Sequence, residues 1–155
     1  KGAATVPQSF VRVLGHLIFS TKHRVAFLNP EIRPKLYGYM AGVLEGEGCR
    51  EILIGGVEDH VHIAFAMAKV TAPIKLVEVV KKQSSKWIKT QDRAFDKFYW
   101  QSGYALFSVS PSNLDTLRGY ILKQEHHHKK MTFQDELRIL LRKHGVEFDE
   151  RYMWD

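Results

Sequence analysis

The chain has 155 residues, of which 45% are hydrophobic and 26% charged, proportions typical of an ordinary globular domain. Its net charge of +6 favours a polyanionic partner such as nucleic acid, although many basic proteins bind none. No apolar run approaches the 18 residues of a membrane span, and the single cysteine, Cys49, excludes an internal disulfide and a thiolate zinc cluster.

Hydrophobic periodicity, turn residues and helix caps predict the elements in chain order. Residues 1–7 receive no element and are interpreted as a short arm or a cloning remnant. The remaining residues predict a strand at 10–21, a helix from Asn29-Pro30 to about Glu45, strands at 49–57 and 60–67, a helix from Thr71-Ala72-Pro73, a strand at 104–110, a helix from 110–113 through Gln124, and a helix from 132–135 to 144–145.

The order β-α-β-β-α-β followed by further helices is the ferredoxin-like arrangement, an α+β fold built on an antiparallel sheet. In this topology the first and third strands form the central pair, so residues of the third strand lie in the middle of the sheet. We expect a single domain over residues 1–155, located in a reducing cytoplasm and without a membrane partner.

His60-Val61-His62 opens the third predicted strand. Side chains alternate between the faces of a strand, so His60 and His62 point to one side while Val61 points to the other. Two imidazoles at this spacing lie roughly 6–7 Å apart at their Cα atoms and can reach one divalent cation, leaving the open coordination positions that a catalytic metal needs. Alternatively, the pair is simply polar and lies at the solvent edge of the strand.

Tyr120 and Gln124 lie four residues apart on the third predicted helix, which places them on one helix face. A glutamine amide oxygen is an acceptable ligand for a hard cation such as Mg²⁺ or Mn²⁺. A tyrosine beside such a metal can attack a phosphodiester and form a phosphotyrosine linkage. The alternative for each residue alone is a tyrosine packed in the core and a solvated glutamine.

Four separated segments resemble the HUH single-tyrosine transposases, the small IS200-like enzymes of simple bacterial and archaeal insertion sequences. The similarity extends over nearly the whole chain, from Ser20 to Tyr152, and the segments follow one another in the family's order. They are GGVEDHVH at 55–62, SSKW at 84–87, WQSGYALFSVS at 100–110 and YILKQ at 120–124.

This resemblance implies that His60 and His62 bind the catalytic metal, with Gln124 as the third ligand. It also implies that Tyr120 is the nucleophile, which forms a 5′-phosphotyrosine and frees a 3′-hydroxyl. The substrates implied are single-stranded element ends that fold into hairpins. The implied assembly is a homodimer in which the tyrosine helix of one subunit can complete the site of the other.

Several other residues have competing interpretations. Tyr104 is a rival nucleophile, but no metal-binding residue lies at a strand or helix interval from it. Gly119 either lets the tyrosine helix move or permits close packing. The histidines and lysines at 126–130 are expected to form the cationic end of a helix rather than a metal site. Asp59 is expected to be a turn residue, with an approach to the metal through water as the alternative.

A basic second helix and further lysines offer a candidate nucleic-acid surface. A charged helix face is usually only solvated. In a protein of net charge +6 with a predicted phosphodiester site, it is also a reasonable surface for contacts with the nucleic-acid backbone. Trp87 is an aromatic that can stack on a base, although the core is the usual place for such a ring. The predicted contact residues are Lys81, Lys82, Lys86, Lys89, Trp87, Lys123, Lys129 and Lys130.

The sequence therefore predicts a metal-dependent transposase that cleaves and rejoins single-stranded DNA at insertion-sequence ends, using Mg²⁺ or Mn²⁺. Two alternatives stay open. One is a domesticated relative that nicks chromosomal repeats with the same residues. The other is a non-catalytic module, because ferredoxin-like sheets also bind RNA by base stacking.

Overall fold

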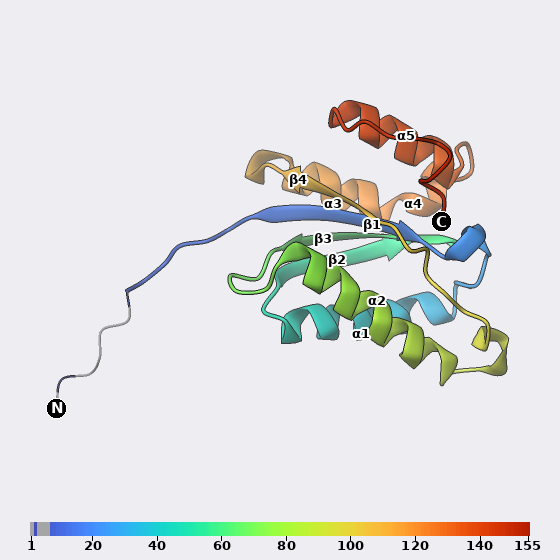
Figure 1. Ribbon diagram of the computed structural model, residues 1–155, viewed down its shortest axis with the longest axis horizontal. Helices are drawn as coiled ribbons and strands as arrows, with labels where there is room; N and C mark the ends of the chain where they lie inside the picture. The colour runs from blue at the N-terminus through green and yellow to red at the C-terminus, as the bar shows by residue number, and fades with distance from the viewer. Residues whose placement is uncertain (1, 3–6) are drawn as a thin grey trace.

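The computed structural model describes residue 2 and residues 7–155, so most of the predicted arm at 1–7 lies outside the described residues (Figure 1). Nine helices and strands are joined by three short 3₁₀ turns in this part of the chain. In chain order they are β1 (Leu14–Ser20), α1 (Ile32–Gly46), β2 (Arg50–Gly56), β3 (His60–Ala66), α2 (Pro73–Lys89), β4 (Ala105–Val109), α3 (Leu114–Leu122), α4 (Gln124–His127) and α5 (Phe133–Lys143). None of the described helices has the length and apolar character needed to cross a membrane.

The predicted ferredoxin-like topology is confirmed. The four strands form one sheet in the order β2-β3-β1-β4, with every neighbouring pair antiparallel, so β1 and β3 are the central strands. The register sets Ile18 opposite His62 and Ser20 opposite His60. The two histidines of β3 therefore lie in the interior of the sheet rather than at its edge.

The sheet separates two layers of helices (Figure 1). On one face α1 and α2 cover Val61, Ile63 and other members of the main hydrophobic core. On the other face lie α3, α4 and α5, where α5 packs on Ile18 and Phe107. Because alternate residues point to opposite faces, the histidines of β3 point toward the second layer.

The first strand is shorter than predicted because its partners end. Leu14 pairs with the last residue of β3, Ala66, and with the last residue of β4, Val109. The described residues 7–13 have no strand on either side, and Phe10 is 84% exposed. The prediction from apolar alternation therefore began the strand too early, at residues that have no partner strand to pair with.

The predicted single helix through Gln124 is wrong at one residue, because Lys123 breaks it (φ −101°, ψ 19°). The Lys123 amide donates to the carbonyl of Tyr120, three residues back instead of four, and this tightens the turn. Tyr120 therefore belongs to α3, and Gln124 is the first residue of α4. The break leaves Leu122 70% exposed and turns Gln124 inward, where it is 1% exposed.

Two glycines near the tyrosine differ in what surrounds them. A Cβ on Gly55, in β2, would lie 2.6 Å from the backbone oxygen of Ile121, so α3 approaches the sheet at this point closely enough to exclude a side chain. A Cβ on Gly119, within α3, would meet no described atom within 4 Å. Close packing therefore does not explain Gly119.

We expect Gly55→Ala to lower the free energy of unfolding by about 1–3 kcal/mol, because α3 must move away from β2. Gly119→Ala is expected to raise it by about 0.5–1 kcal/mol, because alanine favours a helix interior and here meets open space. Urea denaturation of the two variants measures both effects. Equal stability of the two would contradict the close contact between β2 and α3.

Candidate metal and tyrosine site

His60 and His62 are both 0% exposed, and one ring nitrogen of each is held in place. The Nδ1 atom of His60 lies 2.7 Å from the Asp59 carboxylate, and the Nδ1 atom of His62 lies 2.7 Å from Nε2 of His16. Each Nε2 atom is thereby turned toward a common centre. A partner on the second ring nitrogen is the usual way in which a protein orients a metal-binding histidine.

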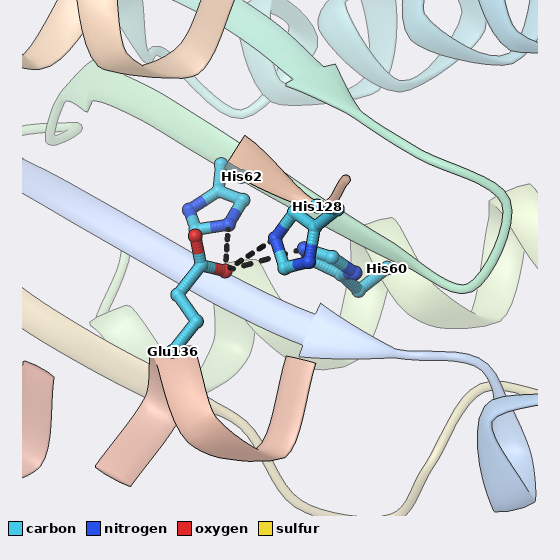
Figure 2. Close-up of side chains that lie close together, drawn as sticks. All are labelled: His60, His62, His128 and Glu136. Carbon is cyan, nitrogen blue, oxygen red and sulfur yellow. Dashed lines mark hydrogen bonds and ion pairs between the residues drawn. The ribbon is translucent and has the colours of Figure 1, made fainter. Parts of the chain in front are cut away.

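The carboxylate of Glu136, on α5, lies at this centre (Figure 2). Its Oε1 atom is 2.8 Å from Nε2 of His62, 3.3 Å from Nε2 of His60 and 3.2 Å from Nε2 of His128. One ligand atom from each of these four side chains lies within 4.8 Å of all the others. Residues from a strand, a loop and the last helix therefore converge on one point.

Tyr120 and Gln124 meet the same carboxylate from its other side. The Tyr120 hydroxyl donates a hydrogen bond to Oε2 of Glu136, and Nε2 of Gln124 donates to the same oxygen at 3.2 Å. The amide oxygen of Gln124 lies 3.2 Å from Nε2 of His60. The structure thus brings together the four residues that the sequence singled out, His60, His62, Tyr120 and Gln124.

Burial and neighbouring charges shift the protonation of the cluster. Burial lowers the pKa of His62, whereas contacts with Asp59 and Glu136 outweigh burial and raise the pKa of His60 to about 9. Burial alone would raise the pKa of Glu136, but the surrounding imidazoles hold it well below its usual range. Burial and the negative charge of Glu136 raise the pKa of the Tyr120 phenol, which favours the neutral hydroxyl.

The donor set fits a divalent cation. Imidazole and carboxylate ligands bind such ions at about 2.0–2.2 Å, which places tetrahedral ligand atoms roughly 3.4 Å apart. Oε1 of Glu136 lies 2.8–3.3 Å from the three Nε2 atoms, near this spacing, and all four atoms lie within 4.8 Å of one another. The burial of His60 and His62 also argues against the alternative of two polar residues at a solvent edge.

The sequence interpretation missed three members of the site. His16, on β1, lies opposite Ala64 and on the same face as Ile18, so alternation along the strand carried a signal for its face but not for its pairing with His62. His128 was expected at the cationic end of a helix, but its imidazole turns into the cluster. Glu136 follows the predicted capping segment and resembles any acidic residue in a first helical turn. In the structure its 2% exposure and its contacts with the three imidazoles distinguish it.

The structure also places the two other candidate residues, Tyr104 and Asp59. Tyr104 lies away from the cluster, whereas Asp59 contacts one of its histidines. Tyr104 is 41% exposed and lines a hollow with residues of α2, such as Ile74 and Val77, on the opposite side of the sheet from the cluster. Asp59 lies in the predicted turn, and its carboxylate orients His60 directly.

The predicted nucleic-acid residues fall into two groups on opposite faces (Figure 1). Those of α2 lie on the layer away from the cluster, where Trp87 stacks on Tyr39 with ring centroids 5.0 Å apart. The Lys81 ammonium donates to the carbonyls of residues 101–103, and burial lowers its pKa to about 8. The exposed group on the same layer as the cluster comprises Lys123, Lys129 and Lys130.

A cavity of about 430 Å³ opens beside the tyrosine, between β4, α3 and α5. Its walls include Tyr120, Glu136 and the apolar side chains of Leu117 and Ile139, and Lys143 also lines it. A space of this size is typical of ligand sites. Tyr120 therefore faces both the cluster and an accessible hollow.

Comparison with known proteins identifies the family of the chain. A family model described as "Transposase IS200 like" matches residues 9–124 of the chain. The chain belongs to the IS200-like transposase family. No curated protein matches it.

Two solved structures share the fold. One is a protein of Deinococcus radiodurans R1, provisionally described as a transposase, with 20% identity and a TM-score of 0.57 over 80% of this chain and 96% of that one. The other is a REP-associated tyrosine transposase bound to a REP hairpin, with 12% identity and a TM-score of 0.55 over 81% of this chain and 74% of that one. At these identities the likeness establishes the α+β fold.

Proposed function

We propose that this protein cleaves and rejoins single-stranded DNA at insertion-sequence ends through a 5′-phosphotyrosine on Tyr120. A divalent cation, Mg²⁺ or Mn²⁺, would be held by His60, His62 and Gln124. The observation that carries the proposal is that the Tyr120 hydroxyl is hydrogen-bonded to the same carboxylate that lies against the imidazoles of His60 and His62. This arrangement supports the proposal, because a phenol and a set of candidate metal ligands would be within reach of one phosphodiester.

The chemistry follows from these positions. The Tyr120 oxygen attacks phosphorus, the bond from phosphorus to the 3′-oxygen breaks, and the 3′-oxygen leaves with a proton as a hydroxyl. A bound cation polarises the phosphodiester oxygens. Oε2 of Glu136 already accepts the hydrogen bond of the Tyr120 hydroxyl and is the atom closest to the departing phenol proton. Attack of a 3′-hydroxyl on the phosphotyrosine reverses the steps and rejoins the strand.

Single-stranded DNA with hairpin-forming ends is the proposed partner. The REP-associated neighbour, described as bound to a hairpin, supports this substrate form. The exposed lysines on the layer of the cluster, Lys123, Lys129 and Lys130, offer phosphate contacts beside the site. We also propose a homodimer in which α3 of one subunit can serve the other. A domesticated repeat-nicking relative would use the same residues, and the DNA that flanks the gene distinguishes it.

Incubation with a labelled hairpin oligonucleotide and Mg²⁺ or Mn²⁺ tests the function. We expect a covalent protein–DNA product from the single-stranded form and little from perfect duplex. If these three lysines contact phosphates, the binding constant should fall with a slope of about −2.1 in log salt, or about 20-fold for a fourfold rise in salt. Equal cutting of duplex, or binding that is indifferent to salt, would contradict the proposal.

A further inference from the structure

We infer that His128 and Glu136 complete the metal site, which then holds three imidazoles and a carboxylate and selects Mn²⁺ over Mg²⁺. This inference rests on the metal dependence proposed above and extends it from an open site of His60, His62 and Gln124. It assigns a ligand to the segment that follows α4 and another to α5.

The three histidines share one arrangement, which is the strongest support for a common ligand. Each Nδ1 atom is anchored: that of His60 by Asp59, that of His62 by His16, and that of His128 by the carbonyl oxygen of Met131 at 2.7 Å. Each Nε2 atom points to the centre occupied by Glu136 Oε1 (Figure 2). Anchoring of the second nitrogen is the pattern of metal-bound histidines.

His128 gives an independent indication. Its Nε2 atom is buried and forms no aligned hydrogen bond within the described part of the chain, although Oε1 of Glu136 is 3.2 Å away. A buried nitrogen without a hydrogen-bond partner is costly, and a metal bond would satisfy it. The Nε2 atom of the neighbouring His127 is also buried without a partner, and His126 is exposed to solvent. Of these three histidines, His128 is the one whose ring nitrogen lies within 4.8 Å of the other cluster atoms.

The ligand types determine which ion the site prefers. Mg²⁺ favours oxygen ligands and retains its water molecules, whereas imidazoles suit first-row transition ions. Manganese accepts both imidazole and carboxylate ligands. Three imidazoles and one carboxylate therefore favour Mn²⁺ over Mg²⁺.

The second oxygen of Glu136 gives the site a further property. Since Oε2 accepts hydrogen bonds from Tyr120 and Gln124, one carboxylate joins the metal ligands to the nucleophile. Glu136 is in this sense a positioning residue for Tyr120 as well as a ligand.

Calorimetric titration of the full chain with Mn²⁺ and with Mg²⁺, in the absence of DNA, tests the inference. We expect wild-type protein to bind Mn²⁺ at least about 100-fold more tightly than Mg²⁺. Glu136→Gln and His128→Asn should each weaken Mn²⁺ binding at least about tenfold. The matched controls Glu147→Gln and His126→Asn alter exposed residues of the same types and should stay within about twofold of wild type.

Pulsed electron paramagnetic resonance of bound Mn²⁺ decides the question even if a variant folds poorly. Three coordinated imidazole nitrogens in the wild type support the inference, and two overturn it. Unchanged Mn²⁺ affinity in both folded variants would also overturn it. These results are separate from the proposed function, which fails only if the wild type forms no metal-dependent adduct with single-stranded DNA.

Discussion

Tyr120→Phe is expected to lower formation of the covalent protein–DNA product at least about 10³-fold, because the variant lacks only the oxygen that is proposed to attack phosphorus. The ring keeps its contacts, including the tilted packing on His127 at 4.6 Å between centroids, so the fold should persist. DNA binding should stay within about twofold of wild type. Denaturing electrophoresis of labelled single-stranded DNA measures the adduct, and a binding assay measures affinity.

Tyr104→Phe is the matched control for this experiment. It removes the same hydroxyl from an exposed tyrosine on the far side of the sheet and should leave the adduct unchanged. An adduct formed at full rate by Tyr120→Phe would overturn the nucleophile assignment. Loss of the adduct in the Tyr104 variant alone would transfer that role to Tyr104.

His60→Ala is expected to reduce cleavage by a similar factor, at least about 10³-fold, for a different reason. The substitution removes one imidazole from the proposed metal site and leaves the carboxylates of Asp59 and Glu136 without their shared partner. Chelation of the wild-type protein should have the same effect, reversed by added Mn²⁺ or Mg²⁺. Adduct formation is again the measurement, and full activity in chelator would refute metal dependence.

The two inactive variants together test the proposed dimer. If α3 of one subunit serves the site of its partner, mixing His60→Ala with Tyr120→Phe and allowing subunits to exchange restores one intact site per mixed dimer. That site combines His60 of the second variant with Tyr120 of the first. Verified exchange without recovered adduct would refute the shared site and leave Tyr120 as the nucleophile. The wild type supplies the reference rate.

The sequence predicted the position of the two β3 histidines because strand alternation is a local rule and the order of elements limits the possible sheet topologies. His60 and His62 had to share a face of β3, and the order of elements placed that strand in the middle of the sheet. The pairing of His16 with His62 depends on contacts between strands that lie 46 residues apart in the chain. Local periodicity carries no information about such a pair.

The sequence also did not predict the break at Lys123 between α3 and α4, for a different reason. Residues 114–127 have helical periodicity on both sides of Lys123, so no composition signal marked the break there. The break is associated with tertiary contacts, since the Gln124 side chain reaches Glu136 and His60. Likewise, the position of Glu136 is set by how α5 packs on the sheet through Phe133 and Leu137. Packing of this kind decides which acidic residue of a surface helix becomes buried.

The position of α5 over the histidines has a consequence for family assignment and for the choice of truncation points. The family match ends at residue 124, the first residue of α4, and so contains His60, His62 and Tyr120 but stops before Glu136. A gene fragment trimmed to the matched segment would retain Tyr120 and lose the carboxylate to which its hydroxyl is hydrogen-bonded. Homology searches based on that segment would group chains with different carboxyl-terminal helices under one description. The residues that follow the match are therefore the natural place to look when sorting this family into subgroups.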